Sequence, residues 1–243
     1  MSSDTLAVNG APTAALSNAA EDVPATVLAL NEVTPELEDE FNRWYEEDAI
    51  PARLSIPGYL SAQRYHSVVD GHSYAAFYRC RSVAALFSPE YKRYMSDLNA
   101  WRMSVRRGFR SLQWSVCHET WSTGNGVGSG AVIVQCSPVT GREAHARAFL
   151  RDELAPRIRR QGGIVRMALW EADPQVTALV DVSSRENLEH YTNWVICIES
   201  SDLMKIAPGL QAELLSVDST ETGLVVGSIM RYALLSAHFK HFK

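Results

Sequence analysis

The chain has 243 residues with a net charge of −5; 46% of its residues are hydrophobic and 21% are charged. Such a chain can bury a sizeable core. The acidic balance argues against nucleic acid as a partner, because nucleic-acid binders usually carry a net basic domain, and no apolar run is long enough to span a membrane.

Both the N-terminus and the cysteines indicate a cytoplasmic protein. Residues 1–22 are small and polar and lack the charged and apolar regions of a signal peptide, so we expect a disordered leader. The cysteines, at 80, 117, 136 and 197, form no CxxC pair and no cluster with zinc spacing. We therefore expect free thiols that behave as small hydrophobic groups in a reduced compartment.

Residues 23–123 predict one unit with the order strand, helix, strand, strand, helix, strand. The strands are expected at 25–33, 59–68, 73–80 and 112–121, and the helices at 35–55 and, broken, at 82–107. Asp70-Gly71 predicts the hairpin between the two middle strands. In the second helix, the arginines at 102, 106, 107 and 110 recur at helical spacing, which favours a solvated helix face over a phosphate-binding surface.

A second unit repeats this order at an offset of 105 residues. The strand from Ala25 lines up with the strand from Gly130, and Phe41–Leu54 falls without a gap on Ala146–Arg159. In the same register, Tyr74–Phe77 lies on Leu179–Val182. We therefore predict a glycine-rich linker at 124–130 and a degenerate second unit at 131–236. The His-Phe-Lys tail from His238 has no evident role.

The predicted fold is α+β, with two tandem ferredoxin-like βαββαβ units. Each unit has one sheet face covered by helices and another face that needs a partner. We expect the two bare faces to pack sheet to sheet as an α/β barrel. The space between the units is then a natural pocket.

The first helix and second strand carry a family resemblance. The segments Glu40–Pro51 and Ile56–Tyr65, with Trp-Tyr-acidic, Ile-Pro, Pro-Gly and Arg-Tyr in sequence, resemble the dimeric α/β-barrel superfamily and most of all its EthD-like branch. The resemblance covers about 90 residues of the first unit. It implies the barrel fold and an activity among cofactor-free monooxygenases, isomerases, polyketide cyclases and dehydratases.

One position departs from the family pattern. The family usually carries a histidine just before Ile-Pro, where this chain has Ala49. In the family that histidine is the natural general acid or base, since imidazole titrates near neutral pH. Either this protein has lost the chemistry, or alanine replaces a histidine in a variant that retains its ligand.

The remaining candidates for catalysis surround position 49. They are Arg64, Tyr45, Asp48 and His66. Arg64 can bind a carboxylate or an enolate, or it pairs with Asp48 or Glu47 at the surface. Asp48 orients a histidine at position 49 or caps a turn. His66 is a second acid or base, or an exposed strand-end residue.

Aromatic residues are candidates for substrate binding, together with His118, which can point into the barrel from its strand. They are Trp44, Tyr78 and Trp114, each of which also suits a core position. In the second unit, Tyr45 corresponds to Leu150 and Arg64 to Leu169. This asymmetry predicts one site, formed mainly by the first unit, with an apolar wall from the second.

We expect a cofactor-independent lyase, isomerase or cyclase that uses acid–base chemistry on a small aromatic or carbonyl compound, impaired here by Ala49. The alternatives are a non-catalytic binding module and a cofactor-free monooxygenase. No cofactor and no metal site is expected, although a haem with one histidine ligand stays open in a barrel of this kind. Association into a homodimer is also possible.

Overall fold

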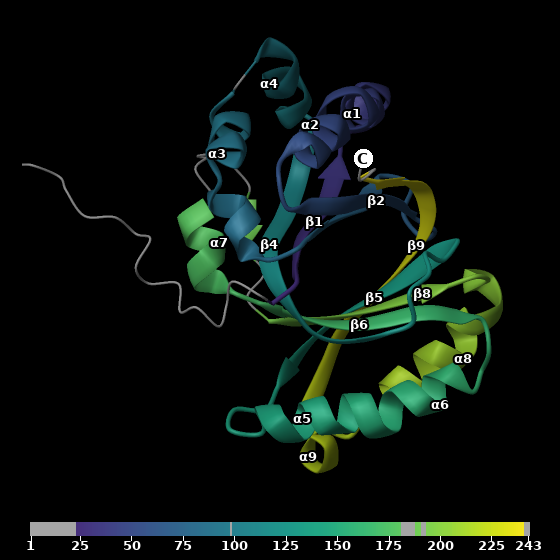
Figure 1. The fold of residues 1–243 in the computed structure, drawn as a ribbon. Helices are drawn as coiled ribbons and strands as arrows, with labels where there is room; N and C mark the ends of the chain where they lie inside the picture. Colours follow the sequence, from purple (N-terminus) through teal and green to yellow (C-terminus); the bar gives the residue numbers. More distant parts are fainter. Residues whose placement is uncertain (1–22, 98, 181–187, 191–192, 241–243) are drawn as a thin grey trace, which may run out of the picture.

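A computed structural model describes residues 23–97, 99–180, 188–190 and 193–240, with the side chains of 188–190 left out. The predicted leader at 1–22 therefore lies outside the described residues. Helices flank a closed sheet on two opposite sides (Figure 1). Among the described residues, no helix combines the length and the apolar character needed to cross a membrane.

The first half of the chain follows the predicted order. Its strands are β1 (Ala25–Val33), β2 (Tyr59–Ser67), β3 (Ser73–Cys80) and β4 (Phe109–Thr123). Its helices are α1 (Glu38–Trp44), α2 (Ile50–Ser55), α3 (Pro89–Ser96) and α4 (Ala100–Arg106), with 3-10 turns at Pro35–Leu37 and Val83–Phe87. The predicted strand from 112 starts earlier, at Phe109, and is longer than expected.

The second half repeats this order with an insertion. Its strands are β5 (Gly130–Pro138), β6 (Ile164–Ala172), β7 (Leu188–His190), β8 (Trp194–Ser200) and β9 (Leu224–Phe239). Its helices are α5 (Glu143–Phe149), α6 (Ala155–Arg159), α7 (Pro174–Val180), α8 (Leu203–Leu215) and α9 (Ser219–Thr222).

The ungapped match at an offset of 105 is wrong beyond β6. Leu179 and Val180, expected in a strand, end helix α7, and Asp181 and Val182 lie outside the described residues. The strand equivalent to β3 is β8, because Ala25 pairs with Cys80 and Gly130 pairs with Ser200. From Cys80 to Ser200 the offset is 120 residues, so about 15 residues with their own helix and strand are inserted here.

Eight strands close into an antiparallel barrel, which confirms the predicted fold. Their order is β1-β3-β2-β9-β5-β8-β6-β4, and β4 returns to β1. The short β7 adds to β4 in parallel. The closing strands are the long ones: β4 leaves β1 to pair with β6, and β9 leaves β5 to pair with β2. The predicted tail is therefore part of the barrel, because His238 lies in β9 opposite Ala62.

Alternate residues of each strand face different cores. On β1, Val27 and Ala29 pack under the helices of the first unit, whereas Leu28 and Leu30 point into the barrel. On β5, Val134 packs under the helices of the second unit and Ile133 points inward. The molecule thus has three apolar cores: one below each helical layer and one inside the barrel.

A π-helical turn precedes a proline in the first long helical segment of each unit. The turns are Tyr45–Ala49 before Pro51 and Leu150–Leu154 before Pro156. Proline has no N–H, and its ring clashes with the carbonyl four residues earlier, so a regular helix cannot continue through it. The wider turn relieves this clash, and its recurrence at an offset of 105 matches the sequence repeat.

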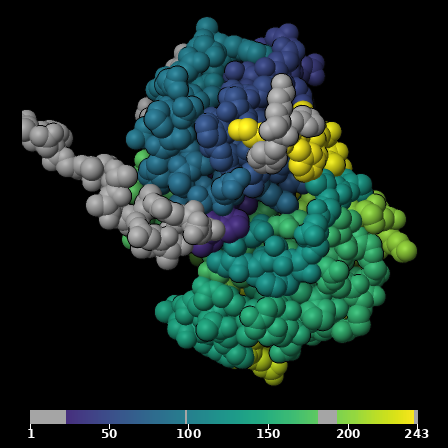
Figure 2. All heavy atoms as spheres, in the orientation of Figure 1, coloured from purple at the N-terminus to yellow at the C-terminus, as the bar shows by residue number. Residues whose placement is uncertain are grey.

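Contacts between the halves interlock them. Helix α7 belongs to the second half, yet Val176 and Val180 pack in the core of the first unit. Figure 2 shows the atoms of the last strand, in yellow, against those of the first half. The division at 23–123 and 131–236 stays a prediction, and the structure joins both parts through shared strands and a shared core.

A buried polar network closes one end of the barrel. The fully buried Glu199 of β8 accepts hydrogen bonds from Tyr65 at 3.0 Å, Gln63 at 3.0 Å and Arg79 at 2.9 Å, all from the first unit. Beside it, Arg166 of β6 donates to Glu119 of β4 at 2.6 Å. The middle of the barrel is filled by apolar side chains, including Phe77 and Trp170. The space at the centre of the barrel is therefore core.

All four cysteines are described and buried, and none of them forms a disulfide bond; the sequence predicted apolar surroundings for Cys80, Cys117 and Cys136. Burial raises the pKa of Cys80, Cys117 and Cys136 to about 12, because a thiolate is poorly solvated there. These groups act as core residues and stay protonated near neutral pH.

We expect Glu199→Gln to lower the free energy of unfolding by about 3 kcal/mol or more, because Arg79 loses its buried counter-charge. Urea denaturation measures this. Asp152→Asn is the control, since Asp152 pairs with Arg151 at an exposed site and its loss should leave the midpoint unchanged. Equal effects of the two variants would show that the network does not hold the units together.

Candidate functional site

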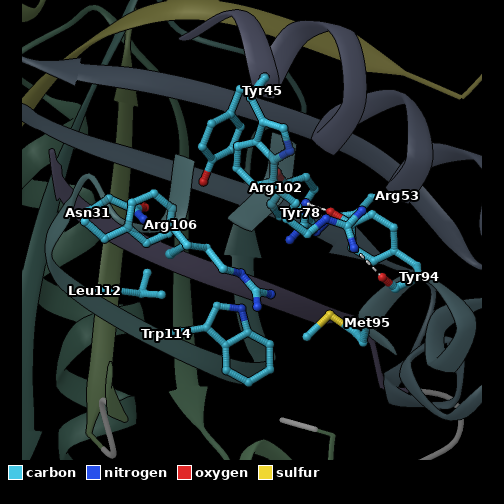
Figure 3. A pocket seen from close by; sticks show the side chains of 13 residues that line it. Asn31, Tyr45, Arg53, Tyr78, Tyr94, Met95, Arg102, Arg106, Leu112 and Trp114 are labelled. Atoms are coloured by element: carbon cyan, nitrogen blue, oxygen red, sulfur yellow. Dashed lines mark hydrogen bonds between the residues drawn. The ribbon is translucent and has the colours of Figure 1, made fainter. Parts of the chain in front are cut away.

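A cavity lies between the sheet of the first unit and its helices (Figure 3). The hollow spans about 470 Å³ with its open mouth included, and about 30 Å³ of it admits the centre of a water molecule. Its aromatic wall consists of Trp44, Tyr45, Tyr78, Tyr94, Phe109 and Trp114. Ala29, Met95 and Leu112 complete the apolar part, Asn31 adds an amide, and Arg53, Arg102 and Arg106 supply the charge.

Three arginines from two helices converge on this cavity. Arg53 of α2 donates to the hydroxyl of Tyr94 at 2.6 Å and lies over the ring of Tyr78, 4.6 Å from its centroid. Arg102 of α4 lies over the ring of Tyr94 at 4.2 Å. Arg106, one turn further along α4, points toward the middle of the cavity in Figure 3. No carboxylate is among the described residues that line the cavity, so the site is cationic.

Arg102 corrects the expectation of a solvated basic helix face. Its side chain is 3% exposed and its guanidinium donates to the backbone carbonyls of Tyr94 and Asp97. It also pairs with Asp48 at 3.4 Å, and Asp48 accepts from the indole of Trp44 at 2.8 Å. The spacing predicted the helix correctly, but it assigned Arg102 to the solvent-exposed face. The guanidinium of Arg102 is buried instead, because backbone carbonyls at the α3–α4 junction accept its hydrogen bonds. Arg107 and Arg110 are exposed as expected.

The buried Tyr78 of the aromatic wall is a neutral hydrogen-bonding group. Burial raises the pKa of Tyr78 well above its ordinary value, with the positive charge of Arg53 opposing that rise. The Tyr78 hydroxyl has no hydrogen-bond partner among the described residues, nor has the Oδ1 atom of Asn31. Buried polar atoms without partners are costly to fold. Their presence at one cavity is a reason to regard it as a site for a ligand.

Four of the predicted residues meet at this cavity. Trp44, Tyr45, Tyr78 and Trp114 all line it, and the hydroxyl of Tyr45 points into it (Figure 3). Arg64 lies behind Tyr45, with its guanidinium 4.2 Å from the ring centroid.

Arg64 is 2% exposed and does not line the cavity. It donates to Asn42 at 2.7 Å and pairs with Glu46 at 3.4 Å. The alternative of a surface pair with Asp48 or Glu47 is therefore wrong. Arg64 fixes the position of Tyr45.

Three other predicted residues lie apart from the cavity. Ala49 is fully buried in the helical core, and its carbonyl accepts from Arg53 at 3.2 Å. His66 contacts the carbonyl of Gly71 in its own hairpin at 2.8 Å. His118 points away from the barrel interior, because it alternates with Cys117, and its Nε2 lies 2.9 Å from Asp173. The expectation that His118 points into the barrel is wrong.

Every described lining residue comes from the first unit, so the expected apolar wall from the second unit is also wrong. The second unit has a packed core at the same place. The residues equivalent to Asn31, Tyr45, Arg53 and Tyr78 are Cys136, Leu150, Ile158 and Ile198, all within that core.

The arginines at 53, 102 and 106, with Tyr94 and Asn31, are the residues that sequence reasoning missed. A signal existed for two of them. Arg53 falls on Ile158 and Asn31 on Cys136 at the offset of 105, the same polar-to-apolar change that singled out Tyr45 and Arg64. Tyr94 and the two arginines of α4 come after segments in which the two halves do not align. The repeat therefore gave no signal for these three residues.

Solved structures share this architecture, although no protein-family model and no curated protein matches the sequence. An anthrone oxidase-like protein matches with a TM-score of 0.60 at 15% identity, over 91% of this chain and 95% of its own. A protein from Fusobacterium nucleatum subsp. nucleatum described as a monooxygenase matches with 0.57 at 11%, over 90% and 95%. A mutant chlorite dismutase from Candidatus Nitrospira defluvii, in complex with cyanide, matches with 0.56 at 12%, over 89% and 92%. At these identities the likeness shows the ferredoxin-like barrel fold, and the EthD-like branch stays a prediction.

A haem with a histidine ligand does not fit the described lining of this cavity. The lining contains no imidazole and no thiolate to bind the iron. The described imidazoles have other contacts: His66 with Gly71, His72 with Glu38, His118 with Asp173, His145 with Glu221 and His238 with Glu46. Among the described residues no group of three metal-binding side chains forms either.

Substitution of Ala49 tests whether an imidazole fits this position. We expect Ala49→His and Ala49→Leu each to lower the free energy of unfolding by about 1 to 3 kcal/mol, because both overpack a filled core. Leucine is the matched control, since Leu154 occupies the equivalent position of the second unit. Chemical denaturation measures both. A histidine variant as stable as the parent would instead show that the imidazole reaches the cavity.

Proposed function

We propose that the first unit binds a small aromatic or carbonyl compound as its enolate or phenolate anion and promotes reaction of that anion without a cofactor. The observation that carries this proposal is the convergence of Arg53, Arg102 and Arg106 on an aromatic cavity with no lining carboxylate. Aromatic walls complement a planar ligand, and a few placed polar groups orient it.

Electrostatics in this cavity favour the anionic form of a ligand. Asp48 offsets the charge of Arg102, while Arg53 contacts tyrosine side chains and a backbone carbonyl. Positive charges held in a partly desolvated site stabilise a developing oxyanion without reorganisation. The pKa of a bound phenol or β-dicarbonyl compound is therefore lowered, and a compound that is already acidic can ionise without a strong base.

The lack of a base among the described lining residues limits which reactions this site supports. The described lining contains neither an imidazole nor a carboxylate that could take a proton. Isomerisation, cyclisation and elimination next to a carbonyl all proceed through an enolate. For a lyase, isomerase or cyclase, this cavity therefore offers the groups that stabilise the oxyanion but no general base. Substrates with an acidic C–H or O–H are the ones that remain reactive.

Cofactor-free oxygenation is the second candidate, supported by similar folds described as anthrone oxidase-like and as a monooxygenase. A carbanion flanked by carbonyl and aromatic groups can itself reduce O2. In the overall reaction a CH2 group becomes C=O with one oxygen atom, and the other oxygen atom leaves with both hydrogens as water. The protein then supplies the ionised substrate and a site shielded from solvent.

We expect the protein to lower the apparent pKa of bound 4-nitrophenol by about one unit, which corresponds to about tenfold tighter binding of the phenolate than of the phenol. The phenolate absorbs visible light, so a pH titration with and without protein measures the shift. Arg106→Met should abolish it. Arg107→Met is the control, because Arg107 is the exposed neighbour in the same segment. A preference for the neutral phenol would contradict the proposal.

Oxygen uptake distinguishes the two reaction classes. With anthrone as the probe, stoichiometric O2 consumption that requires Arg106 supports oxygenation. Binding of anthrone without O2 consumption, together with exchange of its acidic hydrogens into D2O, supports enolate chemistry of the isomerase type. If anthrone neither binds nor exchanges its acidic hydrogens, the result contradicts both reaction classes.

A further inference from the structure

A second cavity opens at the end of the barrel opposite the Glu199 network, and we call it the barrel mouth. About 230 Å³ of it admits the centre of a water molecule, far more than the arginine-lined cavity offers. Strands β1, β3 and β4 of the first half and strands β5 and β9 of the second half contribute to its lining. It therefore exists only in the closed barrel.

The polar lining of the barrel mouth is almost entirely neutral. It consists of the amides Asn31, Gln113 and Gln135 and the hydroxyls Ser73, Ser111 and Ser228. Glu32 is the sole charged residue among the described lining, and no arginine or lysine is present there. Amides and hydroxyls both donate and accept hydrogen bonds. The lining therefore suits a neutral ligand and disfavours an anion.

Hydrogen bonds hold these groups in place. Ser228 donates to Gln135 at 2.6 Å, and Gln135 donates to Gln113 at 2.7 Å, which links β9, β5 and β4 across the mouth. Each amide of this hydrogen-bond chain keeps further donor and acceptor capacity that a ligand hydroxyl can use.

The floor of the barrel mouth is apolar and aromatic. Leu30, Met230 and Tyr232 form it, and the Tyr232 hydroxyl lies 3.5 Å from the sulfur of Met230. Burial raises the pKa of Tyr232 to about 12, so this phenol is neutral near neutral pH. A ligand seated here meets an apolar face below and hydrogen-bonding groups around its rim.

We propose that the barrel mouth is a second binding site, for a small neutral molecule that carries several hydroxyl groups around an apolar ring face, as a sugar or a cyclic polyol does. The ligand's hydroxyl groups form hydrogen bonds with the amides and serines of the rim, and its ring face lies on Tyr232 and Met230. The two cavities thus select opposite chemistries, an aromatic anion in one and a neutral polyol in the other. The inference does not depend on the proposed function of the arginine-lined cavity.

The methionines allow each cavity to be observed separately. Met230 lines the barrel mouth, Met95 lines the arginine-lined cavity and Met204 is 70% exposed. In full-length protein labelled with 13C at the methionine methyl groups, we expect D-glucose or myo-inositol to shift the Met230 signal saturably and to leave Met95 and Met204 in place. Benzoate should instead shift Met95, a result that concerns the proposed function alone.

Variants at the rim complete the test. Gln135→Leu removes the centre of the hydrogen-bond chain and should weaken polyol binding about tenfold, while Ser228→Ala, which removes only a hydroxyl, should weaken it less. Arg106→Met should leave it unchanged. The inference is overturned if both polyols fail to shift Met230, if they shift Met95 instead, or if neither rim variant alters the titration.

Discussion

The pairing of β4 and β9 with the opposite unit is the constraint on which the rest of this structure depends. A four-stranded ferredoxin-like sheet has two open edges and one bare apolar face. Because β4 spans 15 residues and β9 spans 16, each strand covers its own sheet and then continues into the other. The pairing removes the open edges, which would otherwise be sites for aggregation. It also fixes the relative position of the two units, which the hydrogen bonds of Glu199 reinforce at one end.

Within this frame, the two helical layers have diverged in a way that physical chemistry makes interpretable. The second unit places apolar residues at equivalent positions and gains a packed core. The first unit places Asn31, Arg53 and Tyr78 there, although polar groups below a helical layer cost free energy unless they are paired. Departures of this kind concentrate at functional sites. Comparison of equivalent positions in the two units thus locates the candidate site in the first unit.

The strand β1 separates two cavities with different chemistry. Its side chains alternate between the helical layer and the barrel, so Ala29 borders the arginine-lined cavity and Leu30 borders the barrel mouth. Asn31, near the end of the strand, borders both. Under the two proposals above, the cationic aromatic cavity and the neutral polar mouth would hold two unlike molecules.

The sequence by itself determined the repeat, the ferredoxin-like order and the barrel, because hydrophobic periodicity and the proline and glycine positions are local properties. It also identified Trp44, Tyr45, Tyr78 and Trp114, since their helical or alternating spacing places them on the buried face. It did not reveal that β8 replaces the expected strand at 179–182, because α7 is equally apolar there and the insertion shifts the register. Only the tertiary structure decided the direction of Arg102 and the burial of Arg64. Their surroundings come from segments distant in the chain, and whether a charged side chain is solvated or buried depends on the partners that the fold brings to it.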